Sequence, residues 1–182
     1  MFQQKYRIES ARLKGWDYAG AGWYFITVCT RNRACLLGQV DAGDVRLSAS
    51  GEIVAEEWQR TAAVRPQIVL DEWVVMPNHL HGIIGILPHE DKPATTGLDT
   101  RQRVAAGRSR LASGSLGAIV GQFKSVCTKR IWAAGAREFG WQPRFFDHVI
   151  RDEAGLRMIR QYILQNPLRW EVDQRRPENL WT

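Results

Sequence analysis

Two of the four histidines lie two residues apart, within residues 76–84 (MPNHLHGII). If this segment is a strand, His79 and His81 project from the same face, because successive side chains alternate between the two faces of a sheet. Two convergent imidazoles supply half of a divalent-metal site. A His-x-His pair also arises by chance in chains of this length, and two histidines at a sheet edge without any ligand are an equally simple interpretation.

A second pair of polar side chains lies on an expected helix that begins after Asp152 and ends before Pro167. Tyr162 and Asn166 are four residues apart, so they stack on one face of that helix. A neighbouring apolar stripe can hold the helix against a sheet; it consists of Leu156, Ile159 and Ile163. Each polar residue also has an ordinary explanation, since tyrosine is common at the border of a core and asparagine is common at a helix end.

The elements that position these candidates alternate between strand and helix patterns. β-branched and aromatic runs predict strands, and periodic apolar residues after a capping residue predict helices. The expected strands cover residues 23–30, 34–40, 45–47, 68–76, 79–87 and 145–150. The expected helices follow Ser50, Ser115 and Asp152 and run to about residues 63, 131 and 166. This order predicts an α+β fold with helices packed on a mostly antiparallel sheet.

Length and composition bound the organisation of the chain. With 182 residues, of which 45% are hydrophobic and 24% charged, the chain fits one globular domain and not a disordered, collagenous or coiled-coil protein. We expect a single domain over residues 1–182, with a flexible basic insertion over about residues 88–115. No apolar run approaches the ~18 residues of a membrane span. The three cysteines form no CxxC pair, which is typical of a cytoplasmic protein without a membrane partner.

The formal net charge of +6 is concentrated in one segment. Residues 100–137 carry eight basic side chains and no acid, which leaves 17 bases and 19 acids for the rest of the chain. Such a block suggests a polyanionic partner, with nucleic acid as the leading candidate, although a solvated basic loop explains it equally well. The candidates for phosphate contacts are Lys124, Lys129 and Arg130.

Five segments, in this order, resemble the REP-associated tyrosine transposases, a branch of the single-tyrosine HUH transposases. They read WYFITVCTRNRACLLG, DEWVVMPNHLHGII, GQFKSVCTKRI, WQPRFFDHVIRDE and YILQNPLRWE. The resemblance extends over roughly residues 12–180, nearly the whole chain. It implies a ferredoxin-like (RRM-like) HUH nuclease fold for the single domain.

The resemblance also implies a mechanism and roles for particular residues. His79 and His81 would bind Mg²⁺ or Mn²⁺, and Asn166 would be the third protein ligand. Tyr162 would attack a phosphodiester of single-stranded DNA, leaving a 5′-phosphotyrosine and a free 3′-OH. His148 lies in a resembling segment and is expected to contact DNA or to support the site.

The same resemblance implies a substrate and a setting. The DNA would form a hairpin of the repetitive extragenic palindrome (REP) kind, and the protein would act as a monomer or homodimer in transposition or recombination. It would be cytoplasmic, and associated with the nucleoid when bound to DNA.

Two other functions fit parts of the sequence. A catalytically silent nucleic-acid-binding protein would keep the fold and the basic segment. A small metallohydrolase would use the two histidines with water as nucleophile, but it needs a carboxylate or a third histidine near the pair. Covalent capture of DNA separates the three hypotheses, because only the transposase forms a protein–DNA adduct.

Overall fold

The computed structural model describes residues 16–88, 112 and 114–174. A four-stranded antiparallel sheet with the strand order β4-β5-β1-β6 forms its centre, and a two-stranded hairpin, β2-β3, is separate from it. The strands are β1 (Gly22–Cys29), β2 (Gly38–Asp41), β3 (Asp44–Leu47), β4 (Ile68–Met76), β5 (His79–Ile86) and β6 (Phe146–Ile150). The helices are α1 (Ala49–Ala63), α2 (Leu116–Ala133) and α3 (Glu153–Gln174), with a 3-10 turn, η1 (Arg31–Arg33), after β1. The predicted α+β class with an antiparallel sheet is therefore confirmed.

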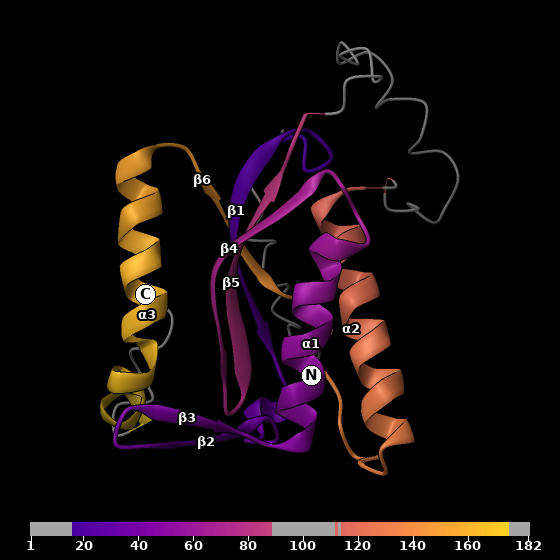
Figure 1. Ribbon diagram of the computed structural model, residues 1–182, viewed down its shortest axis with the longest axis vertical. Helices are drawn as coiled ribbons and strands as arrows, with labels where there is room; N and C mark the ends of the chain where they lie inside the picture. The colour runs from indigo at the N-terminus through magenta and orange to yellow at the C-terminus, as the bar shows by residue number, and fades with distance from the viewer. Residues whose placement is uncertain (1–15, 89–111, 113, 175–182) are drawn as a thin grey trace, which may run out of the picture.

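The sheet separates two layers of helix (Figure 1). α1 and α2 lie side by side on one face, and α3 lies on the other. Alternation along β1 directs Tyr24 and Ile26 into the larger core under α1 and α2, where Trp58 is completely buried. The residue between them, Phe25, faces α3 instead. A smaller cluster holds α3 to the sheet; its buried members are Phe25, Ile83, Ile150, Leu156 and Ile163.

The helices begin at capping side chains, two of which the sequence identified. The Ser115 and Asp152 caps are confirmed, because each side chain accepts a hydrogen bond from the backbone N–H three residues on. The prediction that Ser50 caps α1 is wrong. Ser48 does so, with its hydroxyl accepting from the Gly51 N–H at 3.2 Å. Both serines are suitable by type, but Ser48 directly follows the end of β3 and retains the extended backbone that a cap requires.

The prediction that α3 ends before Pro167 is also wrong, since the helix continues through it to Gln174. Proline lacks an N–H and so removes one helical hydrogen bond. Contacts beyond the proline offset this loss. Leu168 lies against Gly43, at the tip of the β2-β3 hairpin that extends towards α3 (Figure 1), and the ring of Trp170 lies 5.8 Å from that of His79. These contacts keep the second half of the helix on the sheet.

The predicted basic insertion lies almost entirely outside the described residues, as do the four arginines at positions 101–110. Among the helices that the structure describes, none is long and apolar enough to cross a membrane.

Candidate metal and nucleophile site

The two histidines of the His-x-His pair open β5, directly after the turn that joins it to β4. In the β1–β5 register His79 lies opposite Cys29 and His81 lies opposite Thr27. Both imidazoles project towards α3, and their ring centroids are 4.3 Å apart. The structure therefore places them on one face of a strand, as the spacing predicts.

Helix α3 brings Tyr162 and Asn166 to the same place. The Tyr162 hydroxyl lies 3.3 Å from Nε2 of His81, and the two rings are 5.3 Å apart. Asn166, one helical turn further along, is only 5% exposed and faces His79. Tyr162 is 40% exposed, so its side chain borders solvent. All four candidate site residues thus come together, from two elements that are about 80 residues apart in the chain.

Two supporting residues hold the imidazoles, and the sequence analysis missed both. Thr27 Oγ1 lies 2.8 Å from His81 Nδ1, and Asn78 Oδ1 lies 2.7 Å from His79 Nδ1. The Asn78 amide also donates to the carbonyl of Arg33 at 3.2 Å, which fixes its nitrogen on that side. Its oxygen therefore faces His79, so His79 carries its proton on Nδ1 and its lone pair on Nε2. Asn78 adjoins the pair in sequence, whereas Thr27 is recognisable only from the strand register.

The environment of His79 fits a metal ligand. Its Nε2 is buried and has no hydrogen-bond partner among the described residues. A buried acceptor left without a partner costs about 1–3 kcal/mol, which binding of a cation would relieve. An outer hydrogen bond on the opposite ring nitrogen is the usual support of a ligating histidine. Two imidazole nitrogens and the Asn166 amide oxygen form a mixed donor set, which suits Mn²⁺ better than the all-oxygen surroundings that Mg²⁺ prefers.

Burial keeps both imidazoles in the neutral form that metal binding needs. The pKa of His79 is lowered to about 4, mainly by burial and further by the charge of Arg33. The Asn166 side chain acts in the opposite direction and raises this pKa, because its amide oxygen accepts a hydrogen bond from the ring in its protonated form. The pKa of His81 is well below its ordinary value, because of burial and the neighbouring His79.

These shifts predict how the metal-free protein responds to pH. Between about pH 6.5 and pH 4 the unfolded chain protonates its histidines while folded His79 stays neutral, so stability falls as the pH falls. His79 should contribute about 3 kcal/mol to this loss, at 1.36 kcal/mol for each unit of its shift. The free energy of unfolding, measured by urea denaturation in EDTA, should therefore fall less steeply between pH 6.5 and pH 4 for His79→Gln than for the unmodified protein. Gln165→Ala, which changes an exposed and uncharged side chain, should retain the full dependence; equal slopes for His79→Gln and the unmodified protein would contradict this assignment.

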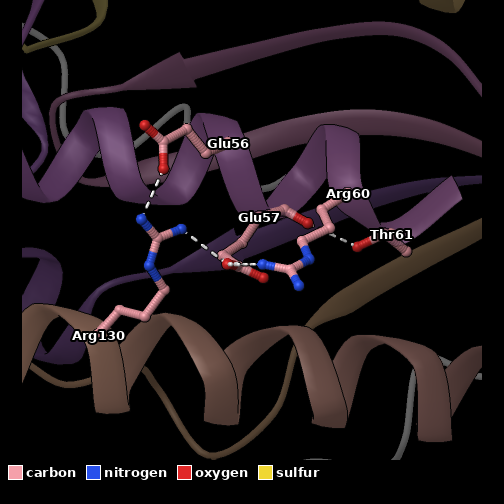
Figure 2. Close-up of polar contacts among 5 residues, drawn as sticks. All are labelled: Glu56, Glu57, Arg60, Thr61 and Arg130. Atoms are coloured by element: carbon pink, nitrogen blue, oxygen red, sulfur yellow. Dashed lines mark hydrogen bonds and ion pairs between the residues drawn. The ribbon is translucent and has the colours of Figure 1, made fainter. Parts of the chain in front are cut away.

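The three basic candidates for DNA contact lie away from this site, on α2, across the sheet from α3. Arg130 joins α2 to α1, since its guanidinium donates to Glu56 at 2.6 Å and to Glu57 at 2.7 Å (Figure 2). Glu57 is almost buried, with 7% of its side chain exposed, whereas Arg130 is 40% exposed, so the guanidinium pairs with two acids at the surface between the helices. Lys124 donates to the carbonyl oxygen of Gln142, and burial lowers its pKa. Both side chains are thus engaged within the protein.

The other two candidates are exposed. Lys129 lies on the surface of α2, so it is accessible but remote from Tyr162. His148 lies on β6, opposite Phe25 in the β1–β6 register, and therefore on the sheet face that carries the two buried histidines. Of the four predicted DNA contacts, the structure places only His148 on the same face as the site.

An antiparallel sheet carries the paired histidines, and a helix packed on it carries the tyrosine beside them. We compared this fold with solved structures. A structure of a REP-associated tyrosine transposase bound to a REP hairpin aligns with 87% of this chain and 74% of its own, at 24% identity and a TM-score of 0.56. The chain therefore has the fold of the HUH transposases, and the structural resemblance expected from the sequence is confirmed. A candidate transposase from Deinococcus radiodurans R1 aligns at 15% identity and a TM-score of 0.46, too low to establish a shared fold.

Sequence comparison identifies a nearer relative. An uncharacterized protein of Haemophilus influenzae (strain ATCC 51907 / DSM 11121 / KW20 / Rd) is 38% identical over 167 residues, which cover 91% of each chain. This chain belongs to the same family as that protein. No protein-family model matches this chain.

Proposed function

We propose that this protein is a metal-dependent endonuclease and strand transferase that cleaves single-stranded DNA through a covalent 5′-phosphotyrosine on Tyr162. The observation that carries the proposal is the contact between the Tyr162 hydroxyl and His81 Nε2 at 3.3 Å, beside the buried His79 and Asn166. This contact brings the oxygen of the proposed nucleophile next to the imidazole nitrogen that would hold the metal, so the attacking group and a phosphate polarised by that metal would lie side by side. The transposase of the same fold binds a REP hairpin, which supports hairpin-forming repeat DNA as the substrate class.

The reaction follows from the groups at the site. The Tyr162 phenol gives its proton to solvent and its oxygen forms a bond to phosphorus, while the bond from phosphorus to the 3′ oxygen breaks. The 3′ oxygen takes up a proton from solvent and leaves as a 3′-OH. Because the phosphodiester is exchanged for another ester, a second 3′-OH can reverse the step and join strands without ATP. Mg²⁺ or Mn²⁺ held by His79, His81 and Asn166 would polarise the phosphate under attack.

Hydrolysis by a metal-bound water is less well supported. Such a site needs a carboxylate or a third histidine close to the pair. Among the described residues, no group of three or more His, Cys, Asp or Glu side chains could hold a metal. The site instead offers an amide and a tyrosine hydroxyl, which fits covalent attack by the tyrosine.

Covalent capture tests the proposal. The protein is incubated with Mn²⁺ and a labelled hairpin oligonucleotide that carries the single-stranded flanks found beside its own gene, and then denatured. We expect labelled DNA that migrates with the protein and is released when the protein is digested. Binding of the oligonucleotide without an adduct, under conditions where Mn²⁺ also binds, would support the silent nucleic-acid-binding alternative.

Asn166 gives a separate prediction about the metal. Asn166→Ala removes an oxygen ligand, so the Mn²⁺ concentration for half-maximal cleavage should rise by at least the roughly 10- to 100-fold that loss of an outer hydrogen-bond partner of a ligand costs. Asn166→Asp supplies a harder, anionic oxygen and should retain or tighten metal binding. The neighbouring Gln165→Ala is the matched control, because Gln165 is exposed and its side chain bonds only to Arg169 among the described contacts. If Asn166→Ala lowers the melting temperature but leaves the Mn²⁺ requirement unchanged, Asn166 is a structural residue.

A further inference from the structure

The edge of the sheet next to Tyr162 carries exposed aromatic side chains. β6 is an edge strand, and its residues Phe146 and His148 lie two apart on the face towards α3. Phe146 is 37% exposed although it is one of the largest apolar residues on the strand. The register places Phe146 opposite Thr27, the residue that supports His81. This edge therefore borders the candidate site directly.

A chain of ring contacts connects Phe146 to the nucleophile. The ring of Phe25 lies edge-on to both, at centroid distances of 6.0 Å from Tyr162 and 6.3 Å from Phe146. Phe25 is itself buried in the cluster under α3, so its position is fixed by packing. The exposed part of Phe146 is thus held one ring away from Tyr162. A nucleotide next to the attacked phosphate would meet this ring.

Charged side chains lie at both ends of β6. Exposed Arg144 lies two residues before the strand and exposed Arg151 directly after it, and the exposed acids Asp152 and Glu153 follow Arg151 at the start of α3, so the net positive charge lies at the Arg144 end. Asp147, the acid within the strand, is buried and opposite Ile26, so it faces the other side of the sheet. Aromatic rings interleaved with cations along a surface are the usual binding mode for unpaired nucleic acid, in which bases stack and phosphates are neutralised.

We propose that Phe146 is the stacking residue for an unpaired base adjacent to the phosphate that Tyr162 attacks. His148 lies beside this base, and Arg144 and Arg151 neutralise the phosphates on either side. The DNA strand therefore follows the β6 edge and not the basic surface of α2. This inference rests on the proposed function, because it takes single-stranded DNA as the substrate.

The test measures binding of the labelled hairpin oligonucleotide by fluorescence anisotropy, in Tyr162→Phe protein so that no covalent product forms. Phe146→Leu keeps an apolar contact with Phe25 but removes the ring, and should weaken binding about 5- to 150-fold, the range for one stacked base. Phe146→Trp should restore it. Oligonucleotides with one base removed at successive flanking positions locate the stacked base. Removal of that base should weaken binding to the parent protein, and Phe146→Leu should then cause no further loss. With a base removed at any other position, Phe146→Leu should still weaken binding.

Trp132→Leu is the matched control, since Trp132 is an exposed aromatic residue on α2, across the sheet. It should leave the affinity unchanged. The inference is overturned if Phe146→Leu binds the intact oligonucleotide as tightly as the parent, if its loss is the same at every abasic position, or if Trp132→Leu weakens binding equally. Failure of the proposed function appears separately, as the absence of an adduct with the unmodified protein while this stacking effect persists.

Discussion

Tyr162→Phe should reduce the covalent protein–DNA adduct to background while leaving DNA affinity within about twofold. The substitution removes only the oxygen that the proposal assigns as the nucleophile. Because the Tyr162 side chain is partly exposed and its hydroxyl lies as far as 3.3 Å from His81, the loss in stability should be below about 1 kcal/mol. The measurement is denaturing electrophoresis of labelled DNA after incubation with Mn²⁺.

Tyr18→Phe provides the control for this experiment. Tyr18 packs against the larger core on the other side of the sheet, so removal of its hydroxyl should leave adduct formation unchanged. An adduct of normal yield with Tyr162→Phe would show that another residue is the nucleophile. Loss of the adduct in both variants would indicate a general effect on folding.

The second large effect concerns the histidines. Saturating Mn²⁺ should stabilise the unmodified protein, by about 2.7 kcal/mol at 100 times the dissociation constant. His79→Ala and His81→Ala should each abolish this increment and reduce cleavage to background. Both side chains are buried, so the variants should also be less stable without metal. Each variant is therefore compared with its own metal-free form by chemical denaturation.

His148→Ala is the control for metal binding, because its imidazole is exposed and lies two strands away from His81. It should retain the full Mn²⁺ increment. A variant of His79 or His81 that keeps both the increment and Mn²⁺-dependent cleavage would place the metal elsewhere. If Mn²⁺ still stabilises His81→Ala but not His79→Ala, the metal is bound by His79 and Asn166 without His81.

The parts of the site that the sequence could predict depend on short-range periodicity. The period of two along a strand places His79 and His81 on one face, and the helical period places Tyr162 and Asn166 together. That these two pairs meet was an inference from family resemblance, and the structure places them in contact. The role of each residue stays a prediction until the variants are tested.

The remaining features depend on contacts between distant residues, which no local pattern encodes. Arg130 lies in a basic segment, which suggests a contact with phosphate. Its partners in the structure are instead Glu56 and Glu57, which lie more than 70 residues earlier in the chain and could not be foreseen from the local sequence. In the sequence Thr27 is an ordinary β-branched residue of a strand, and only the β1–β5 register shows that it lies opposite His81. The end of α3 was misjudged because proline is a local signal, whereas the contacts that carry the helix past it come from elsewhere in the fold.

The unequal cores on the two faces of the sheet have a consequence for hydrogen exchange. Helix α3 rests on a cluster of five buried apolar residues, whereas α1 and α2 share one several times larger. The free energy that opposes local opening should therefore be lower for α3 than for α1 and α2, and its amides should exchange before those of the opposite layer. The histidines belong to the sheet and Asn166 to α3, so a ligand that bridges them opposes this opening. If His79, His81 and Asn166 hold a metal as proposed, its binding should therefore slow hydrogen exchange in this one helix.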